Sequence, residues 1–345
     1  MRHQRAEGWS RREFLSGLIL AGTGGLLGLQ LGPVAAEPLP EITTLKLGQI
    51  PGICVAPAYV AEELLQGEGF TDVQYVNKDV GFTTVKTLAS GEVDIDMAFA
   101  GPLIIRLDAG DPIVLLAGGH IGCFELFGTD RVRAIHDLKG KSVAVPGLGS
   151  SQHVFLSSMA AYVGLDPRKD INWVTYPFAE STQLLAEGKI DSVLAYPPQP
   201  QELRARQIGH VVVNGTMDRP WSQYFCCIVA GNREFVRKHP VATKRALRAI
   251  LKTADVCALE PERAARFLVD RGFTQRYDYA VQALKDIPYR KWREYDPEDT
   301  VRFYALRLHE AGMIKSTPQD HRPGHGLALP QRAKKGTEGI GCLGI

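Results

Sequence analysis

The sequence lacks a surplus of charge of either sign. Its 40 Lys and Arg stand against 38 Asp and Glu, for a formal net charge of +2. The first 36 residues hold four of the arginines and two of the acids, so residues 37–345 carry 36 charges of each sign. A chain without a basic surplus has no global field for binding nucleic acid or an anionic membrane, and we expect neither partner.

The six cysteines lack the spacings that disulfide scaffolds and metal modules use. They stand at positions 54, 123, 226, 227, 257 and 342, with no CxxC pair and no Cys/His pattern typical of zinc. The adjacent Cys226 and Cys227 fall in an expected strand, where neighbouring side chains point to opposite faces. We therefore expect mostly buried, small apolar side chains, with no metal site and no cofactor. Which cysteines pair, if any, stays open.

Signatures of catalysis are also missing. The loop GLGSS at Gly147–Ser151 matches neither a GxSxG nucleophile elbow nor a phosphate loop ending in GK[ST], and it lacks the third glycine of a dinucleotide fingerprint. A serine with His120 and His153 could be imagined as part of a triad, but the spacing nominates no carboxylate. We expect no catalytic residue and no enzyme activity.

The N-terminus has the pattern of an export signal. An adjacent arginine pair in SRREFL (residues 10–15) precedes a Gly-rich apolar run over 17–31 and the small residues Val34–Ala36. This resembles a twin-arginine signal and predicts cleavage after Ala36, with delivery to the periplasm after folding in the cytoplasm. The alternative is a retained membrane anchor, which the glycines in the run disfavour.

Short strand-like runs alternate with helix-like runs from residue 45 onward, and this alternation predicts crossover units in mostly parallel sheets. The expected strands are 45–49, 73–77, 94–99, 113–117, 141–145, 171–176, 192–196, 211–214 and 224–231. The expected helices are 57–66, 82–89, 102–109, 151–163, 180–187, 240–258, 261–271, 277–284 and 299–311, with a further helical start at 235–238.

An internal repeat indicates two similar α/β lobes. The run LASGEVD at Leu88–Asp94 recurs as LAEGKID at Leu185–Asp191, an offset of 97 residues. Each copy reads as a helix ended by Gly, a tight turn and a strand with one buried face. We expect a first lobe over 43–125 and 224–314, a second lobe over 126–223, and two strands joining them as a hinge. The tail 315–345 lacks apolar periodicity and is expected to be disordered.

Four loops at the carboxyl ends of expected strands are the candidate walls of one cleft between the lobes. Backbone N–H groups at helix starts attract anions or polar oxygens, and aromatic side chains offer stacking faces. The expected ligand contacts are Cys54, Pro57, Tyr59, Phe99, Ala100, Gly101, His120, Gly147, Ser150, Ser151, Tyr196, Pro197 and Trp221.

Several runs resemble one branch of the periplasmic substrate-binding proteins of ABC importers. The runs are APAYVAEE (56–63), LASGEVDIDMAFAGP (88–102), DLKGKSVAVPGLGSS (137–151), LLAEGKIDSVLAYPP (184–198) and AGNREFVRKHP (230–240). They are similar to the nitrate/sulfonate/taurine and pyrimidine-precursor branch, the SsuA/THI5-like or NMT1 family.

The resemblance implies a type II periplasmic-binding-protein fold and the capture of a small organic solute. The solute would be a sulfonate-, taurine- or nitrate-like anion, or a pyrimidine-type heterocycle, delivered by a monomer to a permease with its ATPase. An enzyme branch of the same family makes a thiamine pyrimidine and carries a CCCFC motif. This chain has only Cys226 and Cys227 there, so that alternative is disfavoured but stays open.

Overall fold

The computed structural model describes residues 37–77 and 83–316, and the expected signal (1–36) and most of the expected tail lie outside the described residues. Contacts within the chain separate Met1–Pro38 from Leu39–Ile345, and the second unit holds the fold described below. None of its described helices is both long and apolar enough to cross a membrane.

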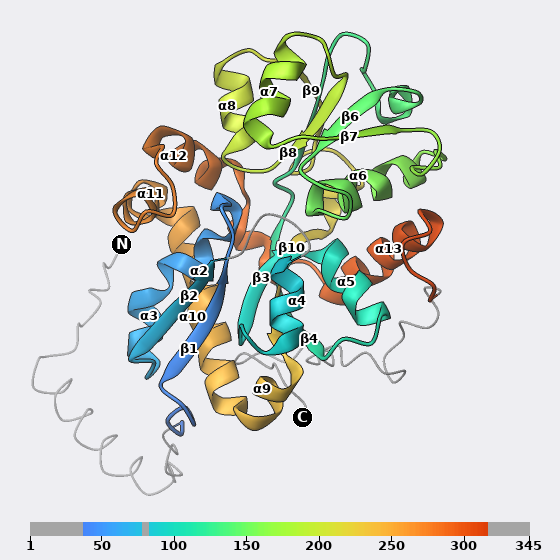
Figure 1. The fold of residues 1–345 in the computed structure, drawn as a ribbon. Coiled ribbons are helices and arrows are strands. Elements are labelled where there is room, and N and C mark those ends of the chain that lie inside the picture. Colours follow the sequence, from blue (N-terminus) through green and yellow to red (C-terminus); the bar gives the residue numbers. More distant parts are fainter. Residues whose placement is uncertain (1–36, 78–82, 317–345) are drawn as a thin grey trace, which may run out of the picture. The chain divides into compact units, whose positions relative to one another are not determined.

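The first sheet has five strands in the order β2-β1-β3-β10-β4 (Figure 1). Its strands are β1 (Thr44–Gln49), β2 (Asp72–Asn77), β3 (Ile95–Phe99), β4 (Ile113–Ile121) and β10 (Phe225–Asn232). β1 runs parallel to β2 and β3, whereas β10 is antiparallel to β3 and β4. All eight residues of β10 are buried, and this late strand lies inside the sheet between β3 and β4.

The second sheet has five strands in the order β7-β6-β8-β5-β9. They are β5 (Glu125–Gly128), β6 (Ser142–Val145), β7 (Asn172–Thr175), β8 (Ser192–Ala195) and β9 (His210–Asn214). β6 is parallel to β7 and β8, and β5 is antiparallel to β8 and β9. The carboxyl ends of three strands therefore meet at one edge of this sheet.

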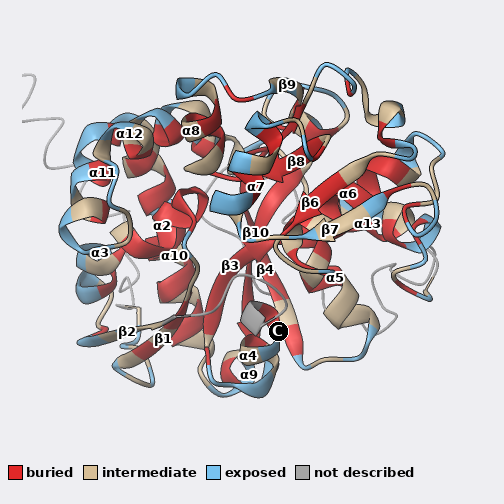
Figure 2. Ribbon diagram, turned by 45° about the horizontal axis from the view of Figure 1, so that its top comes forward, coloured by how far each residue is buried: buried red, intermediate tan, exposed pale blue. Residues whose placement is uncertain are grey.

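Helices pack on both sheets; β3, β8 and β10 are buried along their whole length, whereas many of the helices have both buried and exposed faces (Figure 2). With the first sheet are η1 (Ile53–Val55), α2 (Ala56–Val60), α3 (Glu62–Gly67), α4 (Thr83–Ser90), α5 (Ala100–Asp108), α9 (Arg233–Lys238), α10 (Pro240–Leu259), α11 (Pro261–Asp270), α12 (Tyr277–Asp286), η4 (Tyr289–Arg293) and α13 (Pro297–Glu310). With the second are η2 (Ile135–Leu138), α6 (Ser151–Tyr162), α7 (Phe178–Ala186) and α8 (Gln199–Ala205), and η3 (Trp221–Gln223) precedes β10.

The expected α/β fold with two lobes is confirmed, and most expected elements occur within two or three residues of their predicted bounds. The elements that were not expected include the strand β5, the helix α8 and the short helices η2, η3 and η4. β5 lies where the sequence suggested only a segment crossing between the lobes, and its place in the second sheet comes from pairing with β8 and β9. α8 begins after Pro197 and Pro198 and has Pro200 in its first turn. This proline-rich run reads as a turn, although Pro is well tolerated in the first turn of a helix.

The two copies of the internal repeat make the same hydrogen bonds. The carboxylate of Asp94 accepts the N–H of Lys46 at 2.8 Å, and the carboxylate of Asp191 accepts the N–H of Ser142 at 2.9 Å. In each copy the aspartate backbone N–H also donates to the carbonyl of the same partner. In each copy, the aspartate just before a strand therefore hydrogen-bonds the neighbouring strand of the same sheet: Asp94 before β3 bonds β1, and Asp191 before β8 bonds β6.

The chain passes between the sheets twice, and the two crossings lie side by side. The first crossing follows Ile121 at the end of β4, and the second follows Asn214 at the end of β9. The N–H of Gly215 donates to the carbonyl of Phe124 at 2.9 Å. Gly122 has φ +60°, and a Cβ there would lie 2.5 Å from the Cα of Thr216. These paired crossings form the hinge of the two lobes.

Candidate functional site

A cavity of about 510 Å³ opens at the carboxyl ends of β6, β7 and β8. Parallel strands bring the loops that follow them to one edge, so this is where an α/β sheet offers a binding site. The cavity is lined by Pro51, Ala144, Val145, Pro146, Gln152, Thr175, Tyr176, Pro177, Phe178, Ser181, Val193, Leu194, Tyr196, Pro198, Gln199 and Glu202. Pro51 belongs to the first lobe, so both lobes contribute to the wall.

The wall of the cavity is mostly apolar, with a few polar groups. Gln152, buried in α6, leaves its Oε1 without a hydrogen-bond partner. Glu202 is the acidic lining residue, and Arg206 pairs with it at 2.7 Å. No Lys, Arg or His is among the lining residues. The cavity therefore supplies hydrogen-bonding groups and apolar surface without a side-chain cation.

The start of α6 is built largely as expected. Ser150 caps the helix by accepting the N–H of His153 at 3.3 Å, and Ser151 is the first helical residue. The N–H of Gly149 donates to Nδ1 of His153 at 2.8 Å. Burial lowers the pKa of His153 to about 4, so this ring is a neutral acceptor at pH 7. Gly147 precedes this turn with open space beside it.

The loop after β1 meets the second lobe directly. The N–H of Ile53 donates to the carbonyl of Pro197 at 3.1 Å, which ties the start of η1 to the loop after β8. A Cβ on Gly52 would lie 3.3 Å from the ring of Tyr196 and 3.4 Å from Sγ of Cys54. Two of the four expected cleft loops are therefore in contact.

The side chain of Tyr59 makes its hydrogen bonds and its ring contact within the first lobe. Its hydroxyl donates to the carbonyl of Ile50 and accepts the N–H of the same residue, both at 2.8 Å. Its ring stacks on Phe273 at 4.3 Å between centroids. Pro57, two residues earlier, is in the first turn of α2. Both residues hold the loop after β1 in place, and neither lines the cavity.

An aromatic cluster joins the two lobes beside the hinge. Phe99, at the start of α5, lies 5.0 Å from Phe155 of α6 and 5.3 Å from Phe124 in the first crossing. Phe155 in turn contacts Trp221 and Tyr304. Phe99 and Trp221, expected as ligand contacts, are 4% and 2% exposed and belong to this packing.

Ala100 and Gly101 begin α5 at a tight contact between the lobes. A Cβ on Gly101 would lie 2.8 Å from Val154 of α6 and 2.8 Å from the ring of Phe99. The absence of a side chain lets the start of α5 approach α6 this closely. The start of α5 in the first lobe therefore lies directly against α6 of the second lobe.

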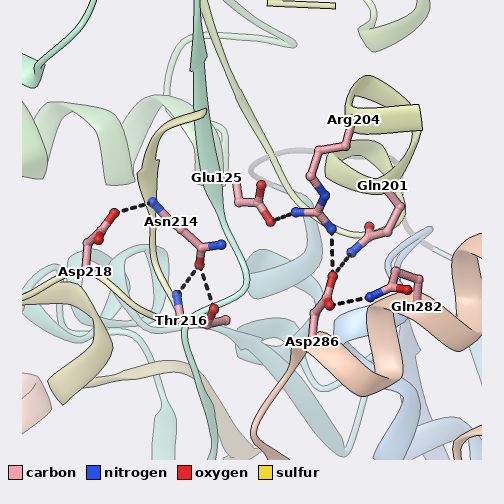
Figure 3. A network of polar contacts seen from close by, with 8 residues as sticks. All are labelled: Glu125, Gln201, Arg204, Asn214, Thr216, Asp218, Gln282 and Asp286. Atoms are coloured by element: carbon pink, nitrogen blue, oxygen red, sulfur yellow. Dashed lines mark hydrogen bonds and ion pairs between the residues drawn. The ribbon is translucent and has the colours of Figure 1, made fainter. Parts of the chain in front are cut away.

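A second polar contact between the lobes lies on α8 and α12 (Figure 3). Arg204 of α8 pairs with Asp286 of α12 at 2.6 Å, and Gln201 donates to the same carboxylate at 3.0 Å. Arg204 also pairs with the buried Glu125 of β5. Burial raises the pKa of Glu125 against the opposing effect of Arg204. We call this group the latch.

Of the expected contacts, Tyr196 alone lines the cavity, and its neighbour Pro198 lines it in place of Pro197. Cys54 and His120 lie together in a separate buried cluster. Sequence reasoning missed the polar lining residues Gln152, Thr175, Ser181 and Glu202. Thr175 could have been predicted, because it ends a strand parallel to β6 and the carboxyl ends of parallel strands meet at the same edge of the sheet. The others are polar residues on helices and read as ordinary surface.

Comparisons with known proteins agree on one family. A profile described as NMT1-like family matches residues 39–269. The bicarbonate-binding protein CmpA of Synechococcus elongatus is 30% identical over 141 residues, which are 40% of this chain and 30% of that protein. A taurine-binding periplasmic protein of Escherichia coli is 24% identical over 221 residues, 61% of this chain and 68% of the relative. The chain thus spans under a third of the first of these relatives.

Solved structures share the fold at low sequence identity. The periplasmic nitrate-binding protein NrtA of Synechocystis PCC 6803 has a TM-score of 0.69 and 17% identity, over 82% of this chain and 85% of that one. The alkanesulfonate-binding protein SsuA of Xanthomonas axonopodis pv. citri, bound to MOPS, has a TM-score of 0.65 and 17% identity, over 82% and 96%. The two mixed five-stranded sheets therefore match the type II periplasmic-binding-protein fold.

Proposed function

Because this chain belongs to the NMT1-like family, we propose that it is the solute-binding component of an ABC importer and has no enzymatic activity. It captures a small organic solute between its lobes and delivers it to a membrane permease with its ATPase. The observation that carries the proposal is the cavity at the carboxyl ends of β6, β7 and β8, with Pro51 of the other lobe on its wall.

The hinge and the latch support a mechanism of closure. Two hydrogen-bonded crossings connect the lobes, and the Arg204–Asp286 pair and the Ile53–Pro197 bond join them at separate places. A solute that touches both lobes binds the closed arrangement better than the open one and shifts the population toward it. The closed arrangement is then the form that a permease distinguishes from the empty protein.

The lining of the cavity favours a neutral heterocycle over an oxyanion. A sulfonate or nitrate would enter without a side-chain cation to offset the loss of its hydration. An aromatic heterocycle would find apolar wall, the ring of Tyr196 and the unpartnered Oε1 of Gln152 as an acceptor. We therefore propose a pyrimidine-type solute ahead of a sulfonate-, taurine- or nitrate-like anion.

We further propose that the protein works in the periplasm as a monomer. The arginine pair at Arg11 and Arg12, before an apolar run, supports export by the twin-arginine pathway. The names of periplasmic relatives that bind taurine and nitrate support the same compartment.

A thermal-shift panel tests the proposal. The purified chain is heated with pyrimidines, taurine, alkanesulfonates, nitrate and bicarbonate, since a solute that binds the folded state raises its Tm. At about 100 times its Kd, such a solute adds about 2.7 kcal/mol to the free energy of unfolding. We expect a pyrimidine to give the largest shift. No shift with any solute, or turnover of one, would contradict the proposal.

A pair of variants locates the binding. Gln152→Ala removes the unpartnered amide from the cavity wall, and we expect it to weaken binding of the selected solute about 5- to 10-fold, the worth of one hydrogen bond. Gln183→Ala is the control, because Gln183 is exposed on α7 and bonds only Glu187 of its own helix. Equal affinities of the two variants would place the solute elsewhere.

A further inference from the structure

Five side chains from three separate segments form a buried group that we call the thiol cluster. Its members are Cys54, His120, Cys123, Cys226 and Cys227, and each is at most 3% exposed. Cys54 comes from η1, His120 and Cys123 from the end of β4 and the first crossing, and the other two from β10. The long separations in sequence explain why no metal spacing is visible there.

The ligand atoms of this cluster lie close enough to share one ion. One donor atom each from Cys54, His120 and Cys123 lies within 4.8 Å of the other two. In a tetrahedral zinc site such donors are about 3.3–3.8 Å apart, so side-chain movements of about 1 Å complete the geometry. Cys227 lies outside this closest group of three but stands opposite His120 in the pairing of β10 with β4, and we take it as the fourth donor.

The His120 ring has the arrangement usual for a metal-binding histidine, with one ring nitrogen bonded to a carbonyl and the other free. Its Nδ1 lies 3.3 Å from the carbonyl of Ile121, a bond that places the ring hydrogen on Nδ1. Its Nε2 is buried without a hydrogen-bond partner and is therefore left as a lone-pair donor. Metal-binding histidines usually have such a carbonyl behind the ring, which fixes the tautomer and the direction of the free nitrogen.

The chemistry of the donors selects the ion. Thiolates and an imidazole favour the thiophilic d10 ions Zn²⁺ and Cu⁺ over hard cations such as Mg²⁺ and Ca²⁺. Three thiolates and one neutral imidazole are among the common donor sets of structural zinc, and with Zn²⁺ they leave a net charge of −1 on the site. Each thiol that becomes a ligand releases its proton to solvent as the ion binds.

We propose that the thiol cluster binds one thiophilic d10 metal ion, Zn²⁺ or Cu⁺, through Cys54, His120 and Cys123, with Cys227 as fourth ligand. The ion would link η1, β10 and the first crossing. Its ligand Cys54 is the residue after Ile53, whose N–H bonds the carbonyl of Pro197 in the second lobe. The site is separate from the cavity, whose wall includes none of the five side chains. It does not depend on the proposed transport function.

Metal titration of the full chain tests this proposal. The protein is purified under reducing conditions, stripped of metal, and titrated separately with Zn²⁺ and with Cu⁺, which distinguishes the two ions. We expect about one ion per chain and a higher Tm of the loaded protein. Substitution with Co²⁺ should give the intense near-ultraviolet absorption of thiolate-to-cobalt charge transfer, which reports the sulfur ligands directly.

Matched variants separate the cluster from other buried thiols. Cys54→Ala and His120→Gln should weaken metal binding at least about 100-fold, more than the loss of a supporting contact costs. Cys257→Ala is the control, because Cys257 is buried in α10 outside the cluster, and it should bind one ion as before. If a variant fails to fold, the titration and cobalt spectrum of the unaltered chain decide the question.

Two results would overturn the proposal. One is a folded, fully reduced chain that binds neither ion and shows no cobalt–thiolate band. The other is a disulfide between Cys123 and Cys226, whose sulfurs lie 3.2 Å apart, in protein purified without reductant and still present after metal is offered under mild reduction. Mass spectrometry of unreduced peptides detects that bond.

Discussion

His153 is a titratable residue held neutral at the start of α6. Burial lowers its pKa from 6.5 to about 4, and the positive end of the helix dipole also disfavours its cation. As the pH falls through 6.5, the unfolded chain gains a proton that the folded chain does not bind. The contribution of His153 therefore becomes unfavourable between pH 6.5 and about pH 4, and it is constant below that range.

His153→Gln should remove this pH dependence while keeping an acceptor for the N–H of Gly149. We expect the free energy of unfolding of the variant, relative to the unaltered protein, to rise by about 1–2 kcal/mol between pH 7 and pH 4, after allowance for partial exposure. Urea unfolding at several pH values measures it. Parallel pH profiles for the two proteins would show that this ring is not the titrating group.

Gly122 is the residue on which the close approach of the two crossings depends. Gly122→Ala would place a Cβ 2.5 Å from the Cα of Thr216 at φ +60°. We expect a loss of about 2–3 kcal/mol of stability, from backbone strain and the clash together. Gly140→Ala is the control, since Gly140 has φ +73° with nothing within 4 Å, and it should lose about 1 kcal/mol. Equal losses in chemical denaturation would mean that the crossings have room to separate.

Among the elements, α8 and α12 carry the latch. Asp286 accepts from Arg204 and Gln201 of the other lobe and from Gln282 of its own helix at 2.6 Å (Figure 3). Asp286→Ala should remove the inter-lobe bonds and increase the population with separated lobes, seen as a larger radius of gyration by small-angle scattering.

Asp278→Ala is the matched control for the latch. Asp278 lies on the same helix, is exposed, and pairs with the nearby Arg276 rather than with the other lobe. Its loss should leave the radius of gyration unchanged. If both variants scatter like the unaltered protein, the latch does not influence the distance between the lobes.

The helices and strands were largely predictable, because apolar residues recur every 2 residues in a strand and every 3.6 residues in a helix, and this pattern can be read from a short stretch of sequence. The helix–Gly–strand repeat was visible in the sequence, and its physical basis is the pair of aspartates that bond neighbouring strands. The short strand β5 was missed, since its burial comes from pairing with β8 and β9, which are distant in sequence.

The candidate site was less predictable than the fold. Of the four loops expected to form the cleft, those after β1 and β8 are joined by the Ile53–Pro197 bond. Which side chains line the cavity depends on how helices turn after each strand, so Gln152 and Ser181 could not be separated from surface residues. The thiol cluster was invisible for a different reason, because its members come together only when β10 inserts between β3 and β4.

In the molecule as a whole, the balance of charge bears on how the proposed solute would be attracted to the cavity. Residues 37–345 carry equal numbers of basic and acidic side chains, so no long-range field steers an anion to the cleft. Helix starts and the apolar wall of the cavity must supply the affinity. The same neutrality agrees with the absence of a cation from the cavity lining.

If a solute binds between the lobes and closes them, calorimetric titration and small-angle X-ray scattering should detect the two events together. With the solute selected by thermal shift, we expect one solute per chain and a smaller radius of gyration on binding, and we expect Gln152→Ala to weaken both effects. A solute that binds with no change in the radius of gyration, and with unaltered affinity for Gln152→Ala, would contradict this expectation.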